Sequence, residues 1–339
     1  MNNLHKQRFL VIGLGSMGKR RIRNLLKNGV KKENIYGYNP TLPRCRETEK
    51  KYGVKTSTHF TSAFKECNPT AFIISAPPDK HAKYFLFALR RGIHFFVEHP
   101  TTQTGYQEAK NDRSSTVKAP SCSWRFHDAM KLMKKTIQEG DIGKVLAFQY
   151  HMGQYLPHWH PWEDYRKVYF SKKSTGACRE MFAFELGWLC YVMNIQPKSV
   201  FGLTEKLSDL PINADDLYSA VVSFSKNVKG NIVIEVLSKK PFRTLRVVGS
   251  EGVLQWEWLD NEIRVHTKKA AWKKIAIKPG RKEKNYNAAE EMYEEEIKAF
   301  LSAVCGSKKY PFSFSENKKY IDALFALEKS AKTKRMMNI

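Results

Sequence analysis

Several features that would place this sequence in a particular class of protein are missing. No apolar run approaches the roughly 20 residues of a membrane-spanning helix. The opening residues, Met-Asn-Asn-Leu-His-Lys-Gln-Arg, are polar and unlike a secretory signal. The six cysteines include no CxxC pair, and no spacing of Cys, His and Asp is typical of a metal site. We therefore expect a cytoplasmic protein with reduced thiols, no membrane segment and no metal.

Acidic residues are scarce relative to basic ones: 33 Asp and Glu stand against 58 Lys and Arg, a net charge of +25. Such an excess attracts nucleic acid, anionic membranes or phosphorylated ligands. The basic residues are spread along the chain in short pairs, such as Lys31-Lys32 and Lys308-Lys309, rather than gathered in one segment. We interpret them as solvated surface residues, expect no nucleic-acid or membrane partner, and regard attraction of a nucleotide sugar as a secondary effect.

Length and composition indicate a globular protein of about two domains, with 339 residues of which 42% are hydrophobic. In the first third, strand patterns alternate with helical patterns, which is typical of a doubly wound parallel sheet. The strands predicted there cover residues 9–12, 34–38, 71–76 and 92–97. Residues 101–120 show no clear apolar period and are interpreted as loop and a short helix. We predict an α/β dinucleotide-binding domain over residues 1–122.

From residue 144 onward, strand patterns dominate, which is typical of an α+β domain with a large, mainly antiparallel open-faced sheet. The predicted strands cover residues 145–150, 217–225, 231–237, 245–249, 253–257 and 262–266. Helices are predicted over residues 81–91 in the first domain, and over residues 124–139, about 179–193, 292–305 and 317–329 in the second. This second domain is expected over residues 123–339, and its last helix is placed so that it can pack back on the first domain.

A glycine motif near the N-terminus organises the chain. Gly13, Gly15 and Gly18 have the spacing GxGxxG, directly after the apolar run 9–12 and before an amphipathic helical pattern. The first glycine permits a tight strand-to-helix turn, the second lets backbone approach a pyrophosphate, and the third lets helix and strand pack closely. The helix N-terminus then offers N–H groups and a positive dipole end. This order predicts dinucleotide binding, rather than a plain strand-turn-helix, by Gly13, Gly15, Ser16, Met17 and Gly18.

The residues after the second predicted strand bear on the choice of dinucleotide. Position 39 lies roughly 20 residues beyond the glycine loop, where an Asp or Glu normally binds the adenine-ribose hydroxyls. Asn39 can hydrogen-bond there but has no charge to repel a 2′-phosphate, and Arg44 and Arg46 follow closely. The predicted cofactor is NAD or NADP, with a weak preference for NADP. Alternatively, Arg44 and Arg46 are only the exposed side of a helix that ends near Lys51.

Short motifs that are specific in combination occur along nearly the whole chain. They are Gly13-Leu-Gly-Ser-Met-Gly18, Ser75-Ala-Pro-Pro-Asp-Lys-His81, Gly92-Ile-His-Phe-Phe-Val-Glu-His-Pro100, Trp124-Arg-Phe-His127, Gly140-Asp-Ile-Gly143, Gly249-Ser-Glu-Gly252 and Pro311. In this combination the chain resembles the Gfo/Idh/MocA oxidoreductases, the family of glucose–fructose oxidoreductase and inositol dehydrogenase. The resemblance implies a Rossmann domain, an open-faced sheet that often forms contacts in a homo-oligomer (a dimer or tetramer), and NAD(P)-dependent hydride transfer at a sugar or cyclitol carbon.

The resemblance also implies further cofactor contacts, at Ala76, Pro77, His81 and Glu98. Two of these residues have simpler interpretations. His81 is well placed to cap the helix that follows the Pro-Pro turn, and Glu98 is expected to support the cofactor or the neighbouring backbone.

The catalytic positions depart from the family. The lysine of its Glu-Lys-Pro motif, which contacts the substrate hydroxyl and the nicotinamide, is His99 here. In the second-domain motif, the Asp position is Glu180, the His position is Phe184, and a further Asp position is Gly187. Because Phe cannot transfer a proton, we predict that His99 is the base, that Glu180 orients it or the substrate, and that His160 is the reserve candidate. With an ordinary imidazole pKa near ~6.5, activity should rise with pH through that range.

Residues 154–166 combine aromatic rings, imidazoles, carboxylates and an arginine within one short segment. Aromatic faces stack on sugar rings and polar groups bind hydroxyls, and loops concentrate function. We predict that this loop forms one wall of the substrate cleft; a surface loop held by its own aromatics is the alternative. The predicted substrate contacts are Trp159, Trp162, Tyr165 and Arg166 from the loop, with Arg125 and with His127, which is otherwise a helix-start residue.

The function predicted from the sequence is hydride transfer between NAD(P) and a ring carbon of a sugar. A nucleotide-linked or amino sugar used in surface carbohydrate synthesis is the expected substrate. The alternative is a dinucleotide- and sugar-binding regulator or partner subunit without turnover. The losses of Lys, His and Asp at three family positions favour this alternative, whereas the glycine loop and the loop 154–166 indicate that a ligand-binding cleft persists.

Overall fold

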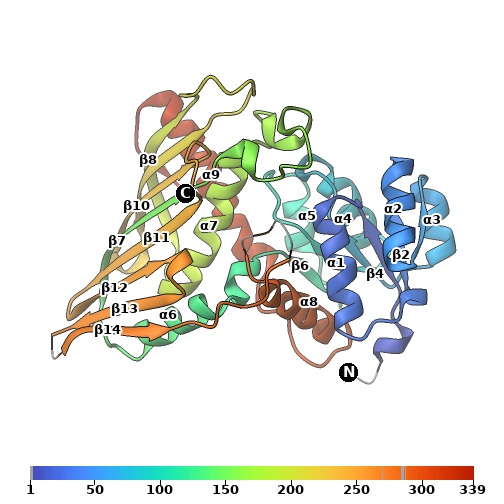
Figure 1. The fold of residues 1–339 in the computed structure, drawn as a ribbon, viewed down its shortest axis with the longest axis horizontal. Helices are drawn as coiled ribbons and strands as arrows, with labels where there is room; N and C mark the ends of the chain where they lie inside the picture. Colours follow the sequence, from blue (N-terminus) through green and yellow to red (C-terminus); the bar gives the residue numbers. More distant parts are fainter. Residues whose placement is uncertain (1–2, 269, 284–285, 287) are drawn as a thin grey trace. The chain divides into compact units, whose positions relative to one another are not determined.

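The computed structural model describes residues 3–268, 270–283, 286 and 288–339, and the chain divides into two compact units (Figure 1). The first unit runs to Ser123 and also contains Glu290–Lys318. The second contains Trp124–Ala289 and Lys319–Ile339. The division at 123/124 lies one residue from the expected boundary. The structure differs from the expected partition in assigning Glu290–Lys318 to the first unit.

The first unit is built on a six-stranded, entirely parallel sheet with the order β3-β2-β1-β4-β5-β6. Its strands are β1 (Phe9–Ile12), β2 (Ile35–Tyr38), β3 (Lys55–Ser57), β4 (Ala71–Ile74), β5 (His94–Val97) and β6 (Lys118–Pro120). Every residue of β1 and β4 is buried, as in a sheet with helices on both faces. The predicted doubly wound sheet is confirmed, and its strand order reverses between β1 and β4.

Among its described residues, this unit contains six complete α-helices: α1 (Ser16–Lys27), α2 (Leu42–Tyr52), α3 (Phe60–Cys67), α4 (His81–Leu89), α5 (Tyr106–Asn111) and α8 (Glu290–Val304). The phosphate-loop helix α1 buries Ile22 and Leu25 and packs on α8, which comes from the far end of the sequence. This packing explains why Glu290–Lys318 belongs to the first unit. The last helix, α9 (Phe314–Thr333), begins in the first unit and continues in the second.

The second unit contains a nine-stranded sheet with the order β14-β13-β12-β11-β7-β10-β9-β8-β15. Only β7 and β10 pair in parallel among its described strands, so the predicted mainly antiparallel sheet is confirmed. The strands are β7 (Val145–Gly153), β8 (Pro197–Glu205), β9 (Leu217–Phe224), β10 (Lys229–Glu235), β11 (Phe242–Gly249), β12 (Gly252–Glu257), β13 (Glu262–Thr267), β14 (Ala270–Ala276) and β15 (Met337–Asn338).

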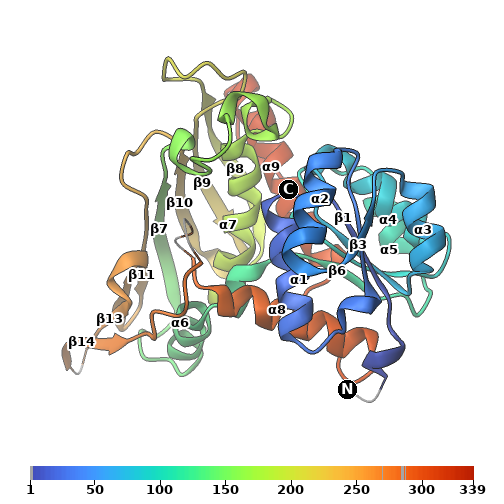
Figure 2. The same ribbon diagram turned by 45° about the vertical axis from the view of Figure 1, so that its right-hand side comes forward.

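Helices α6 (Asp128–Gln138) and α7 (Ala177–Met193) cover one side of this sheet (Figure 2). Helix α7 packs on β9 and β10, and α6 packs on α7 and β13. The burial of β9 alternates along the strand, as expected where only one face meets the core. Among the residues that the structure describes, no helix is long and apolar enough to cross a membrane.

Candidate functional site

Two of the three loop glycines are required by the fold itself. Gly13 has φ +93°, and a Cβ there would lie 2.6 Å from the Ser75 carbonyl oxygen. A Cβ on Gly18 would lie 1.8 Å from the carbonyl oxygen of Gly13. Any side chain at either position would force α1 away from the strand ends. The tight turn predicted at Gly13 and the close helix–strand packing predicted at Gly18 are therefore present.

Gly15 is different, because no protein atom requires its hydrogen side chain. Its φ of −74° is accessible to any residue. A Cβ there would meet only the Nη1 atom of Arg44, at an ordinary contact distance of 3.4 Å. The space in front of Gly15 is thus large enough for a methyl group, yet the residue is glycine. This is the position at which the motif leaves room for a pyrophosphate.

The N-terminus of α1 fits an anionic ligand. The helix begins at Ser16, its N-cap residue Gly15 supplies no capping side chain, and no acidic residue lies in the first turn. It directly follows β1, next to the reversal of strand order between β1 and β4, where open α/β sheets bind ligands. The helix dipole and the N–H groups of the first turn, from Ser16 and Met17 onward, favour phosphate there.

Asn39 and Arg44 flank this loop. Asn39 is buried, and its Oδ1 accepts a hydrogen bond of 3.1 Å from the Leu14 backbone N–H. The side chain therefore braces the glycine loop. Arg44, on the exposed face of α2, extends its guanidinium toward Gly15. Arg44 is thus an exposed residue of α2 whose guanidinium lies beside the glycine loop.

The segment after β4 contains the predicted contacts Ala76, Pro77 and His81. The structure corrects the expectation that His81 caps α4: the N-cap is Lys80, without a capping side-chain bond. Instead the buried His81 donates from Nε2 to the Ala76 carbonyl at 2.7 Å, which fixes the turn between β4 and α4. Burial lowers the pKa of His81 to about 4, so the ring is neutral near pH 7.

His99 lies two residues beyond the end of β5 and is 5% exposed. Burial is the main reason that its pKa falls to about 3, with His81 contributing, and a backbone hydrogen bond with Ser121 opposes this only in part. The expected rise of activity with pH through the usual imidazole range is therefore corrected. The ring is already neutral at pH 5, and a neutral imidazole can accept a proton.

Glu180 and Phe184 lie one turn apart on α7, in the second unit, and both are partly exposed. The Tyr169 hydroxyl donates to Oε1 of Glu180 at 3.4 Å. In the neighbouring loop, Nδ1 of His160 lies 3.7 Å from a carboxylate oxygen of Glu163. This unit thus holds a carboxylate at the family Asp position and an apolar ring at the family His position.

The loop 154–166 presents aromatic and charged groups to solvent. The Trp162 ring is stacked on His160 with centroids 5.0 Å apart, and Trp162 is 44% exposed. Trp159 donates from Nε1 to the Gln154 carbonyl at 3.3 Å. Arg166 is exposed and forms a two-point contact with Asp164, at 2.8 and 2.9 Å, and Tyr165 is half-buried beside it. The Trp162 ring also contacts Tyr286, with centroids 5.5 Å apart, so only part of the indole is exposed, together with the Arg166 side chain.

Two predicted substrate residues have structural roles in the second unit. Arg125 is buried, and its Nη2 donates to the Gly187 carbonyl and to the Tyr320 hydroxyl, at 3.2 and 3.3 Å. His127 is the N-cap of α6, and its Nδ1 accepts from the Ala129 N–H at 3.1 Å. These contacts account for both side chains without a ligand, and for His127 the helix-start alternative agrees with the structure.

Sequence reasoning missed a buried charge cluster beneath the glycine loop, centred on Arg21. Its side chain is fully buried and binds Glu98, the residue before His99. One signal was available: Arg21 lies three residues after Gly18 and four before Leu25, on the inward face of the predicted helix. The partner Glu296, which lies far away in the sequence, had no such signal. Among the described residues, no group of three or more His, Cys, Asp or Glu is arranged to hold a metal ion.

Comparisons with known proteins match both units. Residues 7–114 match the oxidoreductase family with an NAD-binding Rossmann fold, and residues 130–255 match the GFO/IDH/MocA C-terminal domain. A levoglucosan dehydrogenase of Pseudarthrobacter phenanthrenivorans is 30% identical over 127 residues, or 36% of this chain. The alignment covers 31% of that relative, so the matched segment spans about a third of its length.

Similarity to solved structures covers nearly the entire chain. A levoglucosan dehydrogenase in complex with NADH and levoglucosan has a TM-score of 0.84 at 17% identity, over 98% of this chain and 99% of that one. An Agrobacterium radiobacter oxidoreductase in complex with NAD+, L-tartaric acid and magnesium has a TM-score of 0.85 at 11% identity, over 98% of both chains. At these identities the likeness shows the fold alone. The two family models, the strand order and the glycine loop together show that the chain belongs to the Gfo/Idh/MocA oxidoreductases, with an NAD-binding Rossmann domain.

Proposed function

We propose that the protein is an NAD(P)-dependent dehydrogenase that oxidises a carbinol carbon of a sugar. The observation that carries the proposal is Gly15, whose missing side chain serves no packing purpose and leaves room beside the uncapped N-terminus of α1. Because the chain belongs to this family, we take the ligand that fills the space beside Gly15 to be a dinucleotide. Gly13 to Gly18 would hold the pyrophosphate, with Asn39 and Arg44 beside the adenosine half of the cofactor.

In the proposed reaction the bound cofactor takes the hydride from the sugar carbon, and the hydroxyl proton goes to the protein. His99 is the proposed acceptor: burial lowers its pKa to about 3, so the imidazole is neutral throughout the neutral range and has a free position for a proton, although the same burial makes it a weaker base than a solvated histidine. Glu180 orients the sugar or His99, and His160 is the reserve base. Phe184 takes no part in proton transfer, because its ring has no acidic or basic group.

Trp162 and Arg166 are the proposed sugar contacts of the second unit. An exposed indole offers an apolar face to a sugar ring, and the guanidinium offers planar donors for hydroxyl or phosphate oxygens. The neighbours' ligands, levoglucosan and L-sorbose, suggest free sugars as first candidates. A nucleotide-linked or amino sugar from surface carbohydrate synthesis is the second candidate class of substrate. The proposed place of action of the protein is the cytoplasm.

We propose that the protein prefers NADP, because Arg44 lies beside the glycine loop and because position 39 is Asn rather than a carboxylate. The guanidinium would pair with the 2′-phosphate, a charge-assisted contact worth roughly 1.5–3 kcal/mol. Arg44→Ala should therefore weaken NADP binding about 10-fold or more and leave NAD binding within a factor of about three. A wild-type dissociation constant much lower for NAD than for NADP would contradict this preference.

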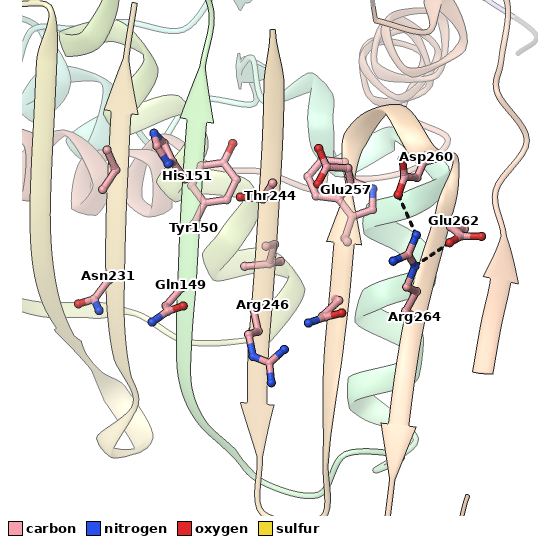
Figure 3. A pocket seen from close by; sticks show the side chains of 14 residues that line it. Gln149, Tyr150, His151, Asn231, Thr244, Arg246, Glu257, Asp260, Glu262 and Arg264 are labelled. Carbon is pink, nitrogen blue, oxygen red and sulfur yellow. Dashed lines mark hydrogen bonds and ion pairs between the residues drawn. The ribbon is translucent and has the colours of Figure 1, made fainter. Parts of the chain in front are cut away.

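A homo-oligomer formed through the uncovered face of the large sheet is the proposed assembly. Figure 3 shows the side chains that line a pocket on this sheet. On the face opposite α7, strand pairing places Gln149, Arg246 and Gln255 in one row, and Glu257 opposite Glu262 in the next. They line a hollow of about 530 Å³. Glu262 is already paired with Arg264 at 2.7 Å, so a twofold axis would set Arg246 of one copy against Glu257 of another. Light scattering should report a dimer or tetramer, and Arg246→Glu should shift it toward monomer.

The competing function is dinucleotide and sugar binding without turnover, favoured by Phe184 at the family His position. One experiment separates the two. The wild-type protein is mixed with NAD+ or NADP+ and a panel of free and nucleotide-linked sugars, and reduced nicotinamide is followed by absorbance. Turnover that His99→Ala lowers about 10²–10⁴-fold supports the dehydrogenase. Saturable cofactor binding without turnover on any sugar supports the binding protein.

A further inference from the structure

A buried guanidinium joins the phosphate-loop helix to the strand ends of the first unit. Arg21 of α1 donates from Nε and Nη2 to the two carboxylate oxygens of Glu98, at 2.6 and 3.0 Å. Its Nη2 lies 2.9 Å from Oε2 of Glu296 on α8. The same Nη2 is 3.3 Å from the Ser121 hydroxyl. One side chain therefore links α1 and α8 with the carboxyl ends of β5 and β6.

The residues that Arg21 contacts are those that hold His99. Glu98 immediately precedes His99, and the Ser121 backbone is close enough to the His99 ring to favour its protonated form. Glu98 also accepts from the Ser75 hydroxyl at the end of β4, at 3.3 Å. Glu296 accepts from the Cys122 backbone N–H at 2.7 Å, which fixes the segment that contains Ser121. The imidazole thus lies beside two segments that are tied to one guanidinium.

The arrangement is rigid because it is buried and planar. Arg21 has no exposed side-chain surface, and its guanidinium lies over the Phe96 ring at 4.6 Å. The carboxylates of Glu98 and Glu296 together raise the pKa of Arg21 above its usual range, although burial alone would lower it. Nε and Nη2 make all of these contacts, so the two hydrogens of Nη2 are shared among three acceptors, while Nη1 is buried without a hydrogen-bond partner. An ammonium on a flexible stem can replace only some of these contacts.

We propose that Arg21 is a positioning residue for hydride transfer: through Glu98 and Ser121 it sets the place of the His99 imidazole relative to the phosphate-loop helix. The inference rests on the proposed function only for its kinetic consequence. The structural part, that Arg21 controls the setting of the His99 ring, holds whether or not the protein turns over.

The adjacent residue provides a matched control. Arg20 is also buried on α1, pairs with Glu290 of α8 at 2.8 Å, and lies over the Tyr293 ring at 4.1 Å. Arg20→Lys and Arg21→Lys therefore each replace a buried guanidinium of the same helix by an ammonium. Glu98→Gln and Glu290→Gln form a second pair that tests the carboxylate side, in case a lysine variant does not fold.

The experiment measures the His99 ring signals by NMR in histidine-labelled protein, assigned with His99→Gln, together with steady-state kinetics and cofactor affinity. Arg21→Lys and Glu98→Gln should shift the His99 signals and lower kcat about 10–100-fold, since a misplacement of about 1 Å costs about 10²-fold. In Arg21→Lys the cofactor dissociation constant should stay within about threefold. Arg20→Lys and Glu290→Gln should leave the His99 signals in place and change kcat by less than about threefold.

Unmoved His99 signals in both Arg21→Lys and Glu98→Gln would overturn the proposal, and so would equal losses of kcat in the Arg20 and Arg21 variants. A lowered melting temperature alone, with kcat and the His99 signals unchanged, would assign Arg21 a purely structural role and overturn it too. If the wild-type protein shows no turnover, the dehydrogenase proposal fails, and the NMR comparison alone decides the role of Arg21.

Discussion

Gly15 allows cofactor binding to be separated from folding with a single methyl group. In Gly15→Ala the new Cβ meets only Arg44 Nη1 at 3.4 Å, and the backbone angles suit alanine. In Gly18→Ala the Cβ would lie 1.8 Å from a backbone oxygen of Gly13, which cannot move aside independently of the strand end. The two substitutions are chemically identical, three residues apart, and should have opposite consequences.

The magnitudes follow from the contacts. At an N-cap, alanine is less favourable than glycine by up to about 1 kcal/mol, while the stiffer unfolded chain returns about 0.4–1 kcal/mol. Gly15→Ala should therefore change stability by less than about 1 kcal/mol. Gly18→Ala should cost about 1–3 kcal/mol or more, as overpacking does. If the methyl group at position 15 removes one or two charge-assisted phosphate contacts, at roughly 1.5–3 kcal/mol each, the dissociation constant should rise at least about 10-fold.

The assay is calorimetric titration with NAD+ and NADP+, alongside urea denaturation of each variant. Gly15→Asp extends the series, because its carboxylate would repel the pyrophosphate and should abolish binding while the protein still unfolds cooperatively. Wild-type cofactor affinity in both Gly15 variants would refute the assignment of this loop. A large loss of stability in Gly15→Ala would refute the reasoning that the fold itself does not need glycine there.

Three further predictions concern other parts of the protein. The His99 ring signals should not titrate between pH 8 and pH 5 in an NMR titration, because burial holds the pKa at about 3; a midpoint near 6.5 would contradict the buried setting. Trp162→Ala and Arg166→Ala should weaken sugar binding about 10-fold each and leave cofactor affinity almost unchanged; normal substrate affinity in both would make the loop structural or part of a subunit interface. Burial raises the pKa of Glu296 from 4.5 to about 7. Between about pH 4.5 and 7 the Glu296 carboxyl is ionised in the unfolded chain but still protonated in the folded protein, so the free energy of unfolding falls as pH rises through this range. The loss is on the order of 3 kcal/mol, since each pKa unit is worth 1.36 kcal/mol. Urea denaturation at pH 5 and 8 should show a smaller difference for Glu296→Gln, and equal differences would contradict the account.

Local sequence patterns predict the strands whose burial is uniform or cleanly alternating. The runs in β1 and β4 are apolar throughout, and the predicted bounds agree with the structure within two residues. Strands β3 and β6 were not predicted because each has three residues, with lysine in both and proline in β6. Their conformation comes from pairing with β2 and β5, which a propensity argument does not contain.

Three strands of the second sheet were missed for related reasons. In β8 the alternating pattern is interrupted by Gly202, where a Cβ would lie 2.2 Å from the Ser219 carbonyl oxygen. In β14 the lysines interrupt the apolar pattern, so the sequence does not indicate a strand that pairs with β13. The two residues of β15 form a strand only because β8 is beside them. The edges of this sheet are thus determined by long-range pairing rather than by local preference.

The candidate site divides in the same way. The glycine loop could be predicted because backbone conformation dictates residue type there. The low pKa of His99 could not, since it depends on burial produced by the whole unit. The cluster of Arg21 with Glu98 and Glu296 brings together residues from three parts of the sequence, and a single sequence indicates only the inward position of Arg21.

The central claim, NAD(P)-dependent oxidation of a sugar that uses His99 as the proton acceptor, is tested most directly by measuring reduced nicotinamide over time. The wild-type protein, His99→Ala and Gly15→Asp are compared with the same cofactor and sugar panel. The account predicts turnover in the wild-type protein, a loss of about 10²–10⁴-fold in His99→Ala with cofactor affinity retained, and no cofactor-dependent activity in Gly15→Asp. Full turnover in His99→Ala, or cofactor binding without turnover on any sugar in the wild-type protein, would contradict it.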